Sequence, residues 1–258
     1  MEILGYVGAL FIGLVLGLTG GGGSILTVPI LVYLMSVSPV TATAYSLFIV
    51  GTTSTFGAIQ NYRKNLVDIK NGFIFAIPSF IAVYLTRKFI VPRIPEIIIE
   101  SPILITKNTF LMLFFAVIMI FGALSVLKKK SQNTNSEEKR NLFLIGIQTF
   151  TIGIIIGLVG AGGGFLIIPS LILFAKLPMK KAVGTSLFII AMNSLVGFIG
   201  DVQNLEIDWM FLLTFSAISV VGIFLGMYLT KYTNESQLKK IFAYFVLVMA
   251  AIILLKEM

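Results

Sequence analysis

The 258-residue sequence contains no cysteine and no histidine. Without cysteine the chain cannot form disulfides, thiolate metal sites or thiol-based redox centres. Without histidine it lacks the commonest metal ligand and proton shuttle. A membrane serine protease would need a histidine base, and an aspartyl protease would need two facing membrane aspartates, which the apolar segments do not supply. The sequence therefore predicts neither an enzyme nor a protein with a metal or another cofactor.

Charged residues are also scarce, at 12%, whereas hydrophobic residues make up 57% of the chain. The mean hydropathy of +1.02 means that a water-soluble core of this size could not bury the apolar surface, so the solvent must be lipid. Eight apolar stretches approach or exceed the roughly 20 residues that cross a bilayer as a helix. They are residues 3–18, 40–60, 71–91, 109–127, 141–159, 182–200, 209–229 and 238–255. The sequence predicts an all-α integral membrane protein.

The sequence also repeats itself, at a constant offset of 140 residues between 17–61 and 157–201, and in a changed register further on, where YLTRK at 84–88 matches YLTKY at 228–232. The run GLTGGGGSILTVPIL, from Gly17, matches GLVGAGGGFLIIPSL, from Gly157, and SLFIV at 46–50 matches SLFII at 186–190. Because glycines and prolines recur at fixed spacing, chance similarity between two apolar segments explains the match poorly. We therefore expect a first membrane repeat at 1–127, a linker at 128–140 and a second membrane repeat at 141–258.

A short apolar segment follows each glycine cluster, roughly at residues 25–37 and 165–175. A helix of that length covers about 16 to 20 Å, which is less than the ~30 Å hydrocarbon core. These segments are predicted to be half-helices or re-entrant arms. They bring the total to about ten hydrophobic helical segments, or five in each repeat.

The distribution of lysine and arginine tests this count. With five crossings per repeat, fourteen basic residues fall in loops on one side of the membrane and five on the other, the five being Arg87, Lys88, Arg93, Lys107 and Lys256. Four crossings per repeat would divide them ten against nine. The positive-inside rule favours the odd count, which places the two repeats in inverted orientations. Both termini should then lie outside and the linker in the cytoplasm. Because membrane orientation accounts for the net charge of +8, we expect no nucleic-acid partner.

The consecutive glycines predict a break in the helix at membrane depth, where non-helical backbone must face protein or a water-filled cavity. Glycine leaves amide groups free, and helices that begin near Ser24 and Phe165 direct their positive ends at the same region. Two such helix starts could hold an anion near the midplane. The alternative is that the glycines only allow close helix packing. The candidate anion-binding residues here are Gly20, Gly21, Gly22, Gly23, Ser24, Gly160, Gly162, Gly163 and Gly164.

The third segment of each repeat adds polar candidates for the same site, namely Ser46, Thr53, Thr185, Ser186 and Asn193. Each hydroxyl could equally bond its own helix backbone or a neighbouring helix. Asp201, near the end of a span, is the one candidate for proton coupling, although its position also fits an interfacial cap. Asp68 and Asp208 are predicted to begin the helices that follow them. The extra segment 91–108, with three prolines and two glutamates, is predicted to be an outward-facing loop or surface arm.

The paired motifs GLTGGGGSILTVPIL and GLVGAGGGFLIIPSLILF, with KKAVGTSLFII downstream, resemble the TauE/SafE sulfite exporter family, also called the toluene sulfonate uptake permease superfamily. The resemblance covers nearly the whole chain and implies a carrier in the inner membrane of a prokaryotic cell, handling sulfite, sulfonates or related sulfur-containing organic anions. The motif residues carried over are Gly20, Gly22, Gly23 and Pro29, with Gly160, Gly162, Gly163 and Pro169. The expected partners are a small anionic substrate and the lipid bilayer. A passive anion channel and a carrier for a non-sulfur organic anion remain alternatives, and the sequence leaves open whether the chain forms a homo-oligomer.

Overall fold

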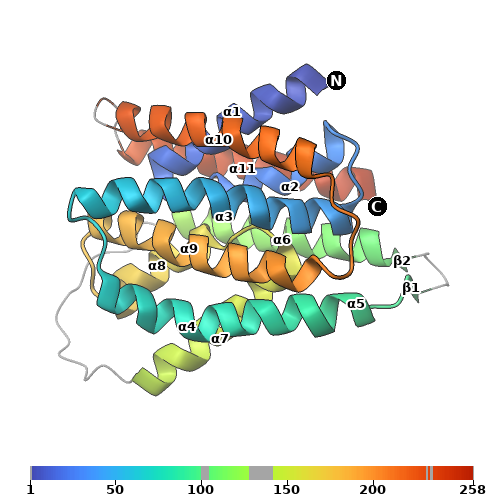
Figure 1. Ribbon diagram of the computed structural model, residues 1–258, viewed down its shortest axis with the longest axis horizontal. Coiled ribbons are helices and arrows are strands. Elements are labelled where there is room, and N and C mark those ends of the chain that lie inside the picture. The colour runs from blue at the N-terminus through green and yellow to red at the C-terminus, as the bar shows by residue number, and fades with distance from the viewer. Residues whose placement is uncertain (1, 100–104, 128–141, 231, 233–234, 258) are drawn as a thin grey trace.

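Ten helices of ten or more residues dominate the computed structural model, which describes residues 2–99, 105–127, 142–230, 232 and 235–257 (Figure 1). They are α1 (Glu2–Thr19), α2 (Ser24–Tyr33), α3 (Pro39–Arg63), α4 (Ile69–Leu85), α6 (Lys107–Leu127), α7 (Leu142–Val159), α8 (Gly164–Phe174), α9 (Met179–Asp201), α10 (Trp209–Leu229) and α11 (Glu235–Glu257). A π-helical turn, η1 (Thr86–Ile90), and the short α5 (Val91–Arg93) extend α4. The predicted all-α membrane architecture is confirmed.

Four stretches are long and apolar enough to cross a bilayer by length and composition: Ile69–Arg93, Lys107–Leu124, Met179–Asp201 and Trp209–Leu229. The two segments that follow the glycine clusters are short, as predicted. Helix α2 has 10 residues and α8 has 11, about half of what a spanning helix needs. Their starts at Ser24 and Gly164 agree with the predicted positions.

Local capping explains where several helices begin. Ser38 precedes Pro39 and accepts a hydrogen bond from the amide of Thr41, so α3 begins with an N-cap and a proline at its first position. Asp68 caps α4 by accepting from the amide of Asn71, and Asp208 caps α10 by accepting from the amide of Phe211. Both aspartates therefore begin the following helix, as predicted.

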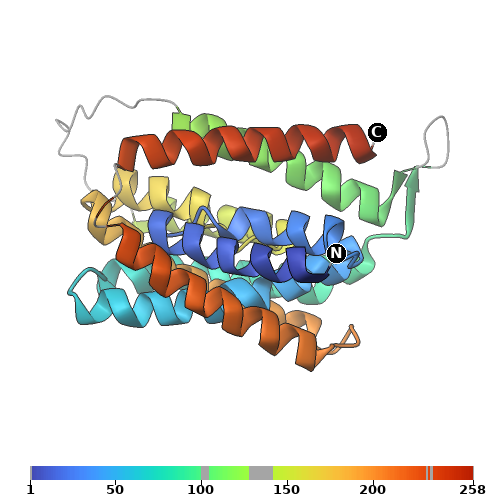
Figure 2. The ribbon, with the colours of Figure 1, turned by 90° about the horizontal axis from the view of Figure 1, so that it is seen from above.

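The helix contacts join the two halves of the chain. Helix α1 packs on α10 and α7 packs on α4, while α3 lies against α9 and α6 against α11. An offset of 140 residues converts the first contact into the second: Gly13 meets the backbone of Ser219, and Gly153 meets the backbone of Ser79. Both chain ends lie at one end of the molecule, and α6 and α11 run together along one side of it (Figures 1 and 2).

The extra segment of the first half forms a small hairpin at the same end as the termini (Figure 1). Strands β1 (Ile97–Ile99) and β2 (Ile105–Thr106) pair antiparallel, with Ile97 opposite Thr106. The predicted loop thus begins later than expected, because η1 and α5 continue the preceding helix to Arg93. The predicted linker 128–140 lies outside the described residues.

Candidate functional site

The two glycine clusters lie against each other. A β-carbon built on Gly21 would come within 2.6 Å of the Cα of Gly164, and one built on Gly164 would overlap the backbone of Gly21. Gly21 precedes α2 and Gly164 begins α8, so the first turns of the two short helices meet. The close approach is possible only because neither residue has a side chain.

The backbone of both clusters has left its helix. Gly20, Gly160, Gly162 and Gly163 have φ values between 63° and 75°, which glycine adopts without strain. Ser24 donates its hydroxyl to the carbonyl of Gly21 at 2.7 Å, and the amide of Gly22 donates to Thr19 Oγ1 at 2.9 Å. Within the described part of the chain, six amides of the two clusters donate no hydrogen bond; they belong to Gly21, Gly23, Ala161, Gly162, Gly164 and Phe165.

Three of the predicted third-segment residues are engaged in contacts between helices, and one of them is Asn193, whose Oδ1 accepts from the hydroxyl of Ser79 at 2.8 Å. Ser186 donates its hydroxyl to the carbonyl of Gly20 at 2.6 Å, and to Val183 in its own helix at 2.8 Å. The hydroxyl of Thr185 accepts from the amide of Asp68 at 2.9 Å and so fixes the start of α4. These bonds give Ser186 and Thr185 a structural role at the edge of the glycine junction.

Other polar atoms of the predicted third-segment residues are buried and have no hydrogen-bond partner among the described residues. The hydroxyls of Ser46 and Thr53 on α3 and the side-chain nitrogen of Asn193 on α9 belong to this set, together with the hydroxyl of Ser194. The side chain of Ser194 lies beside the second cluster, 3.1 Å from a β-carbon built on Gly162. Buried donors of this kind ordinarily bind water or a solute, because an unmet hydrogen bond is costly.

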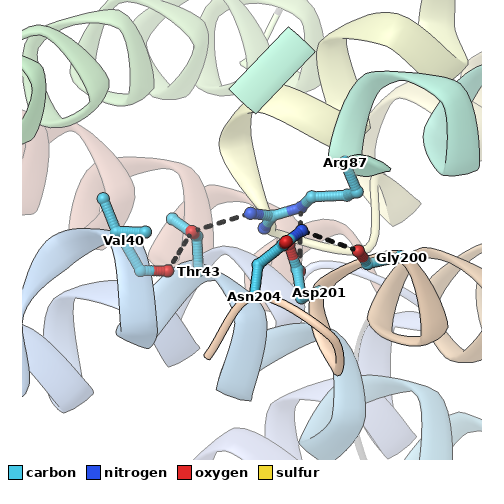
Figure 3. Close-up of polar contacts among 6 residues, drawn as sticks. All are labelled: Val40, Thr43, Arg87, Gly200, Asp201 and Asn204. Atoms are coloured by element: carbon cyan, nitrogen blue, oxygen red, sulfur yellow. Dashed lines mark hydrogen bonds and ion pairs between the residues drawn. The ribbon is translucent and has the colours of Figure 1, made fainter. Parts of the chain in front are cut away.

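A buried ion pair adjoins the second cluster, and sequence reasoning missed it (Figure 3). Arg87 is 0% exposed, and its Nε lies 3.4 Å from Asp201 Oδ2. Its Nη1 donates to Thr43 Oγ1 at 3.1 Å, and Thr43 in turn donates to the carbonyl of Val40. The Nη2 atom lies 2.6 Å from the position of a β-carbon on Gly160.

The placement of Arg87 in a loop was therefore wrong. Arg87 falls within the predicted apolar stretch 71–91, and the structure continues this helix through η1 and α5, which brings the guanidinium inside. Without Arg87 the predicted loop count is fourteen basic residues against four, and the topology that this count favours stays a prediction. The carboxylate of Asp201 is also buried, and it lies beside Arg87 rather than at a water-facing cap.

At an offset of 140 residues the positions that correspond to this pair carry no charge, whereas the match of YLTRK at 84–88 with YLTKY at 228–232 would pair Arg87 with Lys231, which lies outside the described residues. Asn61 and Met227 stand 140 residues from Asp201 and Arg87, respectively, and the Asn61 side chain lies 3.6 Å from Met227 Sδ. The Asn61 amide donates instead to the carbonyl of Gly57. The ion pair is therefore a departure from the repeat.

A cavity of about 490 Å³ lies where α3 and α10 begin. Its lining includes Thr41, Tyr45, Asp208 and Phe211, together with the turn that follows α2. The Tyr45 hydroxyl accepts from the amide of Asp208 at 2.7 Å at this place. None of the described residues that line this cavity is a predicted anion-binding residue.

Comparison with known proteins identifies relatives over most of the chain. Residues 6–253 match the family model described as Sulfite exporter TauE/SafE. A "Probable membrane transporter protein" of Xylella fastidiosa (strain 9a5c) is 26% identical over 246 residues, which cover 93% of this chain and 89% of the relative. The "Probable membrane transporter protein YunE" of Bacillus subtilis is 29% identical over 233 residues, or 79% of each chain. No solved structure matches the chain.

Proposed function

Because the chain belongs to the TauE/SafE sulfite exporter family, we propose that it is a secondary transporter of small anions that works by alternating access around the junction of its two glycine clusters. Family membership and the apolar helices make it a multi-pass membrane transporter, with a small substrate and a lipid environment. Sulfite, sulfonates and related sulfur-containing organic anions are the proposed substrates.

The main support for anion binding is the contact between Gly21 and Gly164 at the first turns of α2 and α8. The free amides of a helix start carry partial positive charge, and two starts at one place add their fields. A negative solute would be held by these amides and by the unpartnered hydroxyls of α3 and α9. The helix starts therefore provide donors without a buried lysine.

Paired contacts between the halves support alternating access around this junction. The α1–α10 and α4–α7 contacts are related by the repeat, and so are the contacts of Gly20 with Val183 and of Gly160 with Thr43. In Figure 1, α1 begins at the end that carries both termini, whereas α7 begins at the opposite end. This arrangement is what inverted repeats require, and in inverted repeats an exchange of equivalent contacts opens the site to the other side of the membrane.

Flux in proteoliposomes tests the proposal. Labelled sulfite or sulfoacetate should enter vesicles that contain the wild-type protein, saturate with concentration and accelerate when unlabelled anion is loaded on the other side. Acceleration from the far side is the mark of a carrier, so flux that neither saturates nor accelerates would indicate a passive channel. Vesicles that carry cations but none of these anions would refute the anion proposal.

A further inference from the structure

Arg87 has more hydrogen-bonding capacity than the protein uses. A guanidinium offers five N–H donors in a planar fork. Thr43 accepts from Nη1, and Asp201 lies at 3.4 Å from Nε, which is longer than the roughly 2.7–2.9 Å of a charge-assisted hydrogen bond. The Nη2 atom is buried and has no partner among the residues that the structure describes. A fully buried cation with unused donors can accept a further ligand.

The unused Nη2 faces the second glycine cluster, beside Gly160. The amides of Ala161 and Gly162, which follow Gly160, are also free within the described chain. Gly160 itself has φ 70° and turns the backbone away from α7 at this point. A charged donor and free amides thus come together on one side of the glycine junction.

Packing alone does not require a charged pair at this position. The related position is filled by Met227 and Asn61, whose contact is uncharged. The other half of the same fold therefore tolerates neutral residues here, and a buried ion pair commonly contributes no more stability than an apolar pair. The pair of Arg87 and Asp201 needs a reason other than stability.

Resting on the transport function proposed above, we infer that Arg87 binds the negative charge of the transported anion and that Asp201 is the resident counterion it displaces. The planar fork of an arginine matches two oxygens of a sulfonate or sulfite group. When the anion arrives at Nη2 and the amides of the second cluster, the guanidinium turns from Asp201 toward it. When the anion leaves, Asp201 neutralises the buried cation again.

The same exchange couples binding to the contact between the halves. Arg87 stands on η1 of the first half, while Asp201 ends α9 of the second half. The ion pair is therefore a bond between halves, and an anion that competes for Arg87 weakens it. A π-helical turn is a frequent feature of functional sites, and here it sets the position of Arg87.

Three proteins test the inference: the wild type, Asp201→Asn, and the double variant Arg87→Met with Asp201→Asn. Binding of sulfite and of sulfoacetate to each purified protein is measured calorimetrically, with thermal unfolding as the measure of folding. Asp201→Asn keeps the cation and removes its competitor, so the Kd should fall about tenfold. The double variant should raise the Kd ten- to a hundredfold, as expected when a charged hydrogen bond is lost. It copies the Met227 and Asn61 pair, so it should melt close to the wild type.

Glu206→Gln is the matched control. It also removes one carboxylate, and Glu206 is exposed in the connection between α9 and α10, so its Kd should stay within about twofold of the wild type. A double variant that folds and binds with wild-type Kd would overturn the inference. Asp201→Asn decides the matter if the double variant does not fold, because an unchanged or weaker affinity there would also overturn it.

Flux of the same proteins separates this inference from the proposed function. A wild type that transports sulfite, together with a Kd that the variants do not change, would remove Arg87 from the site and leave the transporter intact. A wild type that carries none of the anions would refute the proposed function, and the Kd series would still decide whether Arg87 binds them. A wild-type protein that binds neither probe would overturn the inference.

Discussion

The meeting of the two helix starts predicts that Gly164→Ala is destabilising and inactivating. The added β-carbon would overlap Gly21, whose carbonyl oxygen and carbon lie 2.6 and 2.7 Å from it. The obstacle is backbone, so it cannot be relieved by rotating a side chain. Overpacking of this kind costs about 1–3 kcal/mol. Because the two helix starts must separate, the free amides no longer face one solute.

A matched glycine isolates this effect. Gly146 also lies in a helix, but a β-carbon built there would meet nothing within 4 Å. Both changes bring the helix propensity of alanine, which favours it over glycine by roughly 0.5–1 kcal/mol. Comparing Gly164→Ala with Gly146→Ala therefore removes the propensity contribution and leaves the overlap. At about 2–4 °C per kcal/mol for a chain of this size, Gly164→Ala should melt about 2–12 °C below Gly146→Ala.

The single tryptophan, Trp209, is 48% exposed and provides a fluorescence signal for thermal unfolding in detergent. Anion flux in liposomes is measured on the same preparations. Gly146→Ala should transport as the wild type does, whereas Gly164→Ala should lose most of its flux. If the two variants melted together and both transported at the wild-type rate, the helix starts could not touch as described, and the site built on their contact would have to be abandoned.

Three further predictions test the site, a helix cap and the topology. Ser194→Ala should change the free energy of unfolding by less than about 0.5 kcal/mol, because the Ser194 hydroxyl has no hydrogen-bond partner among the described residues. The same variant should raise the KM for the anion about tenfold. An unchanged KM would place the hydroxyl outside the site. Asp208→Ala should lower the free energy of unfolding by about 1 kcal/mol, because the helix cap loses its hydrogen bond to the Phe211 amide. The Tm should fall while the substrate preference stays unchanged. An unchanged Tm would mean that the cap contributes nothing to stability. In this cysteine-free chain, Lys64→Cys and Gln203→Cys place single thiols in related exposed turns, and an impermeant maleimide should label only Gln203→Cys from outside intact cells. Labelling of both thiols from one side would contradict inverted repeats.

Local signals in the sequence were sufficient to locate the helix breaks. Runs of glycine cannot continue a helix without a large entropic cost, so the starts of α2 and α8 were predictable to within a residue. The caps at Asp68 and Asp208 follow from a side chain that reaches an amide three residues later. Each of these features depends on residues that are neighbours in the chain.

The roles of single polar residues could not be predicted in this way. Ser186 and Ser46 occupy related positions in the repeat, but the hydroxyl of Ser186 donates to Gly20 while that of Ser46 has no partner within the described chain. Arg87 follows an apolar run and therefore resembles a loop residue in a charge count. Its burial depends on Asp201, Thr43 and Gly160, which come from three other parts of the sequence.

The departure from the repeat at Arg87 also bears on how the transporter works. Two identical halves around one junction would present an anion with the same surroundings from either side of the membrane. A cation from the first half makes these surroundings unequal, because Gly160 has Arg87 beside it as well as Thr43, whereas the atoms nearest to a β-carbon on Gly20 all belong to Val183. The states open to the two sides then differ in free energy and in affinity for the anion. Under the proposed mechanism, duplication would supply two exchangeable arrangements of the helices, and the unpaired change at Arg87 and Asp201 would supply the difference between them.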